Sequence, residues 1–94
     1  MRQLLSVLRD TRAKLADSGN DLTWSSWEDQ PTALAELDRH LNALAAGQID
    51  KLALDVLFAP TGPIQEVSLS SGWGDDFLVL AERYDTAIAE GAPR

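Results

Sequence analysis

The chain has 94 residues, of which 45% are hydrophobic and 24% charged, and these proportions are typical of one globular domain covering residues 1–94. Its formal net charge is −7 at pH 7, so it lacks the basic surface that nucleic-acid phosphates require, and we expect no nucleic-acid partner. It has no cysteine, which excludes disulfides, thiolate nucleophiles and cysteine metal sites.

The N-terminal residues do not follow the pattern of a secretory leader. They lack a long apolar stretch that ends in small residues at a cleavage site. No apolar run in the chain approaches the roughly 20 residues that cross a bilayer. These absences, together with that of cysteine, predict a cytoplasmic protein without a membrane partner. The scarce lysine and abundant alanine and leucine resemble the composition of proteins from GC-rich bacteria.

The first predicted helix covers residues 3–17. Apolar positions recur there at spacings of three and four, which places them on one face. Gly19 can adopt the left-handed conformation that ends a helix, so we expect the helix to end near Asp17. Residues 1–16 hold four basic residues and one acidic residue, whereas the rest of the chain holds four basic and fourteen acidic residues, and such an asymmetry can mark a partner surface. The expected buried face consists of Leu4, Leu8, Thr11 and Leu15.

Two further helices are predicted at residues 30–46 and 74–90. Asp29 can cap the first of them, where Pro31 is tolerated in the opening turn, and Gly47 can close it. The last helix has acidic residues in its first turn, which complement the positive end of the helix dipole. The expected buried stripes are Leu34, Leu37, Leu41 and Leu44 in the first, and Phe77, Leu80, Ala81, Tyr84 and Ile88 in the second.

Residues 51–59 and 64–70 are predicted to be the two strands of an antiparallel β-hairpin. Apolar and polar residues alternate in both segments, which is the period of a half-buried strand. The turn between them, Ala59-Pro60-Thr61-Gly62, fits type I, with proline in the second position and glycine in the fourth. The register that faces Val56 with Val67 places five side chains in the core, namely Leu54, Val56, Phe58, Val67 and Leu69.

Residues 21–26 alternate in the same way and are predicted to form a third strand. The predicted fold is therefore α+β, with a small antiparallel sheet packed on one face by three helices, in the order α-β-α-β-β-α. If residues 21–26 form a loop instead, the alternative is a lone hairpin inside a three-helix cluster.

The residues that could carry chemistry do not assemble into a catalytic set. His40, the one histidine of the sequence, lies one turn after Glu36 on the predicted second helix, where a local ion pair explains it without a catalytic role. Asp75 and Asp76 are ordinary first-turn residues of a helix, and they would repel a phosphate. The sequence has no calcium loop, zinc ligand set, nucleophile elbow or phosphate-binding loop. We therefore predict no catalytic residue, cofactor or metal, and no enzyme activity.

Three tryptophans lie at the boundaries of the predicted elements instead of inside their apolar stripes. Trp24 and Trp27 precede the second helix, and Trp73 precedes the last. Tryptophan often serves as bulk in small cores, but at such boundaries it can also anchor an interface, and both interpretations stay open. The candidate interaction surface consists of Trp24, Trp27, Trp73, Asp75, Asp76, Arg9 and Arg12.

These features favour a non-enzymatic protein–protein interaction domain. An acidic domain that neutralises a basic partner, as an immunity protein or antitoxin does, is one form of this hypothesis, and an adaptor is another. Self-association is a further form, in which Arg9 and Arg12 of one copy meet the acidic surface of another. The alternative hypothesis is a small-molecule-binding module, with a pocket between sheet and helices lined by the tryptophans and His40.

Overall fold

The computed structural model describes residues 2–23, 25–60 and 62–91, and within these ranges the chain forms helices and loops but no strand. The predicted α+β fold is therefore wrong, and so is the alternative of a lone hairpin among three helices. The described helices are α1 (Arg2–Leu15), α2 (Gln30–Ala45), α3 (Lys51–Leu57), α4 (Pro63–Ser71) and α5 (Gly74–Gly91).

Three of these helices, α1, α2 and α5, lie where the apolar spacing predicts them. α1 ends at Leu15, two residues before the expected end, and Gly19 beyond it does not adopt the left-handed conformation. α2 begins after Asp29 as predicted, because the Asp29 side chain accepts a hydrogen bond from the Thr32 backbone N–H at 2.9 Å. Gly47 follows the end of α2 with a left-handed φ of 77°.

The buried stripes of these three helices match the prediction closely. All four expected residues of α1 are buried, and Val7 joins them. In α5 the expected stripe is buried except for Ala81, which is half-buried. In α2 the stripe is narrower than predicted, since Leu37 and Leu44 are buried whereas Leu34 and Leu41 are half-buried.

The first predicted strand is instead α3. Asp50 caps this helix, with its side chain accepting a hydrogen bond from the Ala53 backbone N–H at 3.2 Å. Lysine, leucine and alanine make up its first turn, and these residues favour a helix over a strand. Leu54, Leu57 and Phe58 are all buried, a spacing of three and four that a strand cannot place on one face.

The second predicted strand is α4, whose two ends are marked by glycine and proline. Gly62 is the N-cap and Pro63 occupies the first turn, where the missing N–H costs no hydrogen bond. Gly72 closes the helix with a left-handed φ of 84°, and its N–H donates to the Ser68 carbonyl. The Gly62 N–H donates to the Ala59 carbonyl at 2.8 Å, and this bond lies between two helices, whereas Thr61 of the predicted type I turn lies outside the described residues.

The helical period, in place of the predicted strand period, explains which of the predicted core residues lie on the surface. Val56 and Leu69 are 56% and 66% exposed, although the hairpin register placed both in the core. Leu54, Phe58 and Val67 are buried as predicted, because they satisfy both the strand period and the helix period. Alternation over such short segments does not separate a strand from a short amphipathic helix.

Residues 21–26 do not form the predicted third strand in their described part. The Thr23 N–H donates to Asp21 Oδ1 at 2.9 Å, and the Ser25 N–H donates to the Leu22 carbonyl at 3.0 Å. Short bonds of this kind, from backbone to a residue two or three positions earlier, are typical of turns. The described part of the segment is therefore a loop between α1 and α2.

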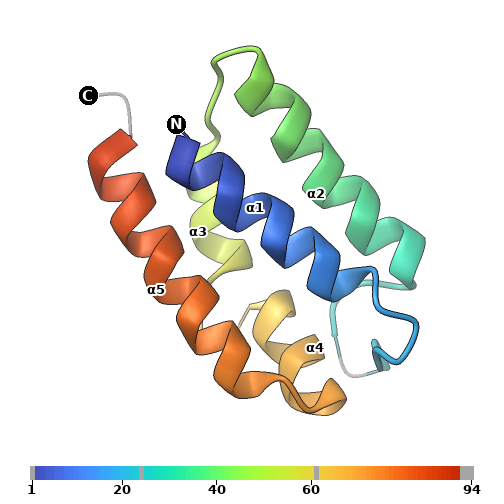
Figure 1. Ribbon diagram of the computed structural model, residues 1–94. Coiled ribbons are helices and arrows are strands. Elements are labelled where there is room, and N and C mark those ends of the chain that lie inside the picture. The colour runs from blue at the N-terminus through green and yellow to red at the C-terminus, as the bar shows by residue number, and fades with distance from the viewer. Residues whose placement is uncertain (1, 24, 61, 92–94) are drawn as a thin grey trace.

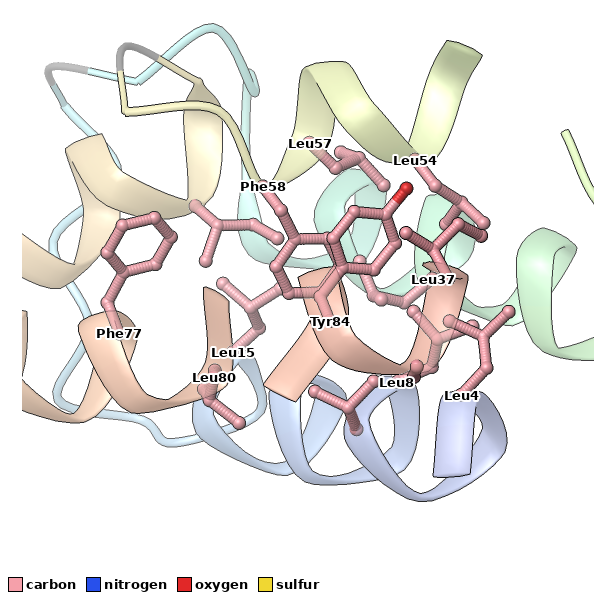
Figure 2. Packing of buried hydrophobic residues seen from close by; sticks show 14 of the residues in the cluster. Leu4, Leu8, Leu15, Leu37, Leu54, Leu57, Phe58, Phe77, Leu80 and Tyr84 are labelled. Carbon is pink, nitrogen blue, oxygen red and sulfur yellow. The ribbon is translucent and has the colours of Figure 1, made fainter. Parts of the chain in front are cut away.

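α1 lies between α2 and α5, and α4 packs against α5 (Figure 1). The inward faces of all five described helices contribute to one apolar cluster (Figure 2). Within the described ranges, no helix has both the length and the apolar character needed to cross a membrane.

Tyr84 is the largest fully buried side chain of this cluster. Its ring stacks on that of Phe58, with centroids 4.4 Å apart and planes inclined by 6° (Figure 2). Its hydroxyl donates to Asp55 Oδ1 at 2.6 Å, so the buried oxygen has a partner on α3. Burial raises the pKa of Tyr84 above its usual range, whereas hydrogen bonds from Lys51 and Tyr84 lower the pKa of Asp55. Tyr84 therefore joins α5 to α3.

The close approach of Gly62 to α3 generates a stability prediction. A Cβ atom at this position would clash with the Val56 carbonyl oxygen and would lie 3.0 Å from that of Leu57. We expect Gly62→Ala to lower the free energy of unfolding by about 1–3 kcal/mol, because backbone atoms must move to accept the methyl group. Chemical denaturation measures this. The control is Gly19→Ala, whose Cβ would meet only Asp17 Oδ1 at 3.4 Å, and an equal loss in both variants would contradict the prediction.

The Tyr84 hydroxyl generates a second stability prediction. Tyr84→Phe keeps the ring on Phe58 but removes the hydrogen bond to the Asp55 carboxylate. We expect the free energy of unfolding to fall by about 1.5–3 kcal/mol, as for a hydrogen bond to a charged acceptor. A double-mutant cycle with Asp55→Ala checks the cause, because Tyr84→Phe should cost clearly less when the acceptor is already absent.

Candidate functional site

α3 turns an apolar face away from the core. Leu52 is 75% exposed and Val56 is 56% exposed, and because they are four residues apart they lie one turn apart on the same side. The other side of the helix holds Leu54 and Leu57 in the core. α3 cannot turn its exposed leucine inward without exposing those two buried leucines.

A groove of about 720 Å³ runs between α2 and α3 beside this face. Leu52 and Val56 stand on the α3 side, and Ala43 contributes a small apolar side chain from α2. Trp27 and Leu57, which belong to the core, lie at the buried side of the groove. We call this feature, with its exposed residues Leu52 and Val56, the α2–α3 groove.

Polar side chains border the α2–α3 groove. Glu36 and Arg39 face each other on α2, with Arg39 Nη2 3.6 Å from Glu36 Oε1. Asp50 borders the other side, where its side chain caps α3. Partial burial lowers the pKa of His40, because it disfavours the charged imidazolium, and the negative charges of Glu36 and Asp50 only partly oppose this effect. His40 is therefore a neutral hydrogen-bonding group at pH 7.

The α2–α3 groove presents an apolar strip with polar side chains at its border. Among the described residues, no three histidine, aspartate or glutamate side chains gather closely enough to hold a metal ion. An apolar strip with a mixed polar border is instead typical of a surface that contacts another molecule.

Trp27 and Trp73, two of the three tryptophans in the predicted interaction surface, lie in different parts of the structure. Trp27 is only 6% exposed, so its side chain packs in the core next to the α2–α3 groove. Its backbone N–H donates to Ser25 Oγ at 3.2 Å. Trp24 lies outside the residues that the structure describes. Trp73 is half-buried at the start of α5, and its Nε1 donates to Asn20 Oδ1 at 2.8 Å.

Trp73 belongs to a polar cluster that joins the end of α1 to the start of α5. Lys14 Nζ lies 5.9 Å from the centroid of the Trp73 ring and 2.6 Å from Asp76 Oδ2. The lysine therefore combines a cation–π contact with an ion pair. Asp75 is exposed beside this cluster, and no described cation pairs with it.

The two predicted arginines of α1 also have different roles. Arg12 binds Asp38 on α2 through two hydrogen bonds, from Nε at 2.6 Å and from Nη2 at 3.2 Å. This fork geometry lowers the pKa of the Asp38 carboxyl and ties α1 to α2. Arg9 is exposed at the groove between α1 and α2, where no described carboxylate pairs with it.

The structure does not bring the predicted interaction surface together. Trp27 lies beside the α2–α3 groove. Trp73 and Asp76 both contact Lys14 where α1 meets α5, and Arg9 and Arg12 lie on the side of α1 that faces α2. Leu52 and Val56 were not predicted as surface residues. Their spacing of four was the available signal, but the same run also alternates, and the strand interpretation placed Val56 in the core.

A comparison with protein-family models, curated proteins and solved structures finds no significant match to this chain.

The position of His40 generates a prediction about pH. We expect an NMR titration to give a pKa below the ordinary value of about 6.5. Between the two pKa values the unfolded chain then binds more protons than the folded chain, so acidification from pH 7 towards pH 5 lowers stability. His40→Gln should flatten the dependence of the thermal midpoint on pH over this window. The carboxylates with lowered pKa values titrate at more acidic pH, and a His40 pKa at or above the ordinary value would contradict the prediction.

Proposed function

We propose that this chain is a non-enzymatic interaction domain that binds a basic partner protein, as a small acidic immunity protein, antitoxin or adaptor does. The observation that carries the proposal is the exposure of Leu52 and Val56 on one face of α3, directly beside the α2–α3 groove. Exposed apolar side chains that are grouped over a groove and bordered by polar residues mark interaction sites more often than scattered ones do.

The partner segment that suits this groove is an amphipathic helix. Its apolar side chains, at a spacing of three or four, would lie on Leu52 and Val56, in the mode by which helices bind apolar grooves. Basic side chains on the same segment would meet Glu36 and Asp50 at the border of the groove. The pair from Arg39 to Glu36 is long, at 3.6 Å, so a partner cation can compete for that carboxylate.

The charge of the whole chain supports a basic partner. A formal charge of −7 on 94 residues attracts a basic protein before contact and raises the rate of encounter more than the strength of the complex. We therefore expect the association rate with the partner to fall steeply as salt rises.

The test compares three tagged forms of the protein as baits in extracts of the source organism. Leu52→Ser/Val56→Ser removes the exposed apolar face, and Leu69→Ser/Val79→Ser is the matched control, because those residues are similarly exposed on α4 and α5. We expect a basic protein that the wild type and the control retain and that the groove variant loses. With that protein purified, the groove variant should bind at least about tenfold more weakly than the control.

Two results would contradict the proposal. One is a retained protein that the groove variant binds as tightly as the wild type does. The other is an association rate that does not change with salt, which removes the electrostatic part of the proposal. Circular dichroism of the three forms shows whether each keeps the helical fold.

A second candidate function is the binding of a small molecule in the same groove. It is favoured by the presence of Trp27 and His40 along the groove and by its volume, which lies in the usual range for ligand pockets. Titration of a metabolite library, followed by tryptophan fluorescence, separates the two candidates. A saturable shift that His40→Ala abolishes favours the small molecule, and no shift favours the partner protein.

A further inference from the structure

Two arginines of this acidic chain differ from its other described cations, because no described carboxylate pairs with them. In the described ranges, five basic side chains pair with a carboxylate within 4.0 Å, namely Arg12, Lys14, Arg39, Lys51 and Arg83. Arg2 and Arg9 have no such partner there, and both are exposed on α1. Because they are seven residues apart, they lie on the same side of the helix, about 10.5 Å from each other along its axis.

Arg2 and Arg9 line a groove of about 500 Å³ between α1 and α2. Leu5 lies between them on α1, and Leu41 faces it from α2, and both leucines are half-buried. The one carboxylate of this groove, Asp38, already accepts both hydrogen bonds of Arg12. The α1–α2 groove therefore presents an apolar floor between two available positive charges.

The outer side of α5 carries the complementary pattern. Asp75 and Glu82 are exposed, are seven residues apart and have no cationic partner among the described residues. Leu78 lies between them and is 61% exposed. This leucine is among the largest apolar side chains left on the surface, and no described helix covers it.

The spacing of the two patterns is the same. Arg2, Leu5 and Arg9 follow each other at three and four residues along α1, and Asp75, Leu78 and Glu82 do so along α5. Two helices placed side by side with these faces in contact would join each arginine to a carboxylate and would bury the exposed leucine. Within one molecule the two faces cannot meet, since α1 separates α2 from α5 (Figure 1).

We propose that the α1–α2 groove binds the outer face of α5 from a second copy of this chain. Ion pairs of Arg2 and Arg9 with Asp75 and Glu82 fix the register, and Leu78 of one copy lies against Leu5 and Leu41 of the other. Burial of these apolar side chains supplies the attraction, and the charges select the face. This contact leaves the α2–α3 groove free, so it goes beyond the function proposed above and does not depend on it.

The experiment measures the mass of the protein by sedimentation velocity, from micromolar to millimolar concentration and at low and high salt. We expect the wild type to associate at low salt and to dissociate as salt screens the ion pairs. The variants Arg2→Glu/Arg9→Glu and Asp75→Arg/Glu82→Arg each place like charges at the contact, and each should raise the dissociation constant at least about tenfold.

A mixture of these two variants is the decisive sample. The acidic groove of the first variant then meets the basic α5 face of the second, and the basic groove of the second meets the acidic α5 face of the first. We expect the mixture to associate although neither variant does so alone. A general effect of net charge would not produce this rescue.

Three controls make the result specific. Arg39→Glu/Glu90→Arg also alters exposed charges, on other faces, and should keep the association of the wild type. Leu52→Ser/Val56→Ser should also keep it, which separates this contact from the partner site. The thermal midpoint of each variant, measured under monomeric conditions, shows that the fold is intact. A wild type that stays monomeric at millimolar concentration, or a mixture that fails to associate, would overturn the proposal.

Discussion

The contact of Tyr84 with Phe58 and Asp55 determines how α3 sits on the rest of the molecule. The phenol ring needs an apolar environment and its hydroxyl needs an acceptor, and α3 with its C-cap supplies both, one turn apart. With this side of α3 held against α5, its other side must face solvent. The exposure of Leu52 and Val56 therefore follows from the burial of Tyr84, and the candidate partner surface depends on an interaction inside the core.

Charge is distributed in the structure in a way that the net value does not reveal. Several cations act inside the molecule: Arg12 ties α1 to α2, Lys14 ties α1 to the start of α5, and Arg83 reaches Asp10 on α1. These pairs are partly exposed, so each contributes little stability, and they join α2 and α5 to α1 at the rim of the apolar cluster. Among the described residues, Arg2 and Arg9 on α1 have no carboxylate partner, and Asp75 and Glu82 on the outer side of α5 have no cationic partner. Such a division is the physical basis for recognition by charge.

The three long helices could be predicted from the sequence because their apolar period persists over 14 to 18 residues. Over that length only a helix keeps the apolar positions on one face. The candidate site could not be predicted in the same way. Whether a tryptophan such as Trp27 or Trp73 lies in the core or on the surface depends on which loop covers it, and Asn20, the partner of the Trp73 ring nitrogen, is 53 residues away along the chain.

The sequence by itself determined the helical segments with long periods and the caps at Asp29 and Gly47, because each of these depends on residues close together in the chain. Only the tertiary structure decided that Lys51–Leu57 and Pro63–Ser71 form helices. Their apolar residues satisfy both a period of two and a period of 3.6, and local preference does not choose between them. Contacts with distant residues select the helical form. Tyr84 stacks on Phe58 and donates a hydrogen bond to Asp55, and the packing of α4 on α5 buries Ile64 and Val67. These contacts favour two helices where the sequence predicts a hairpin, and they leave Val56 on the surface.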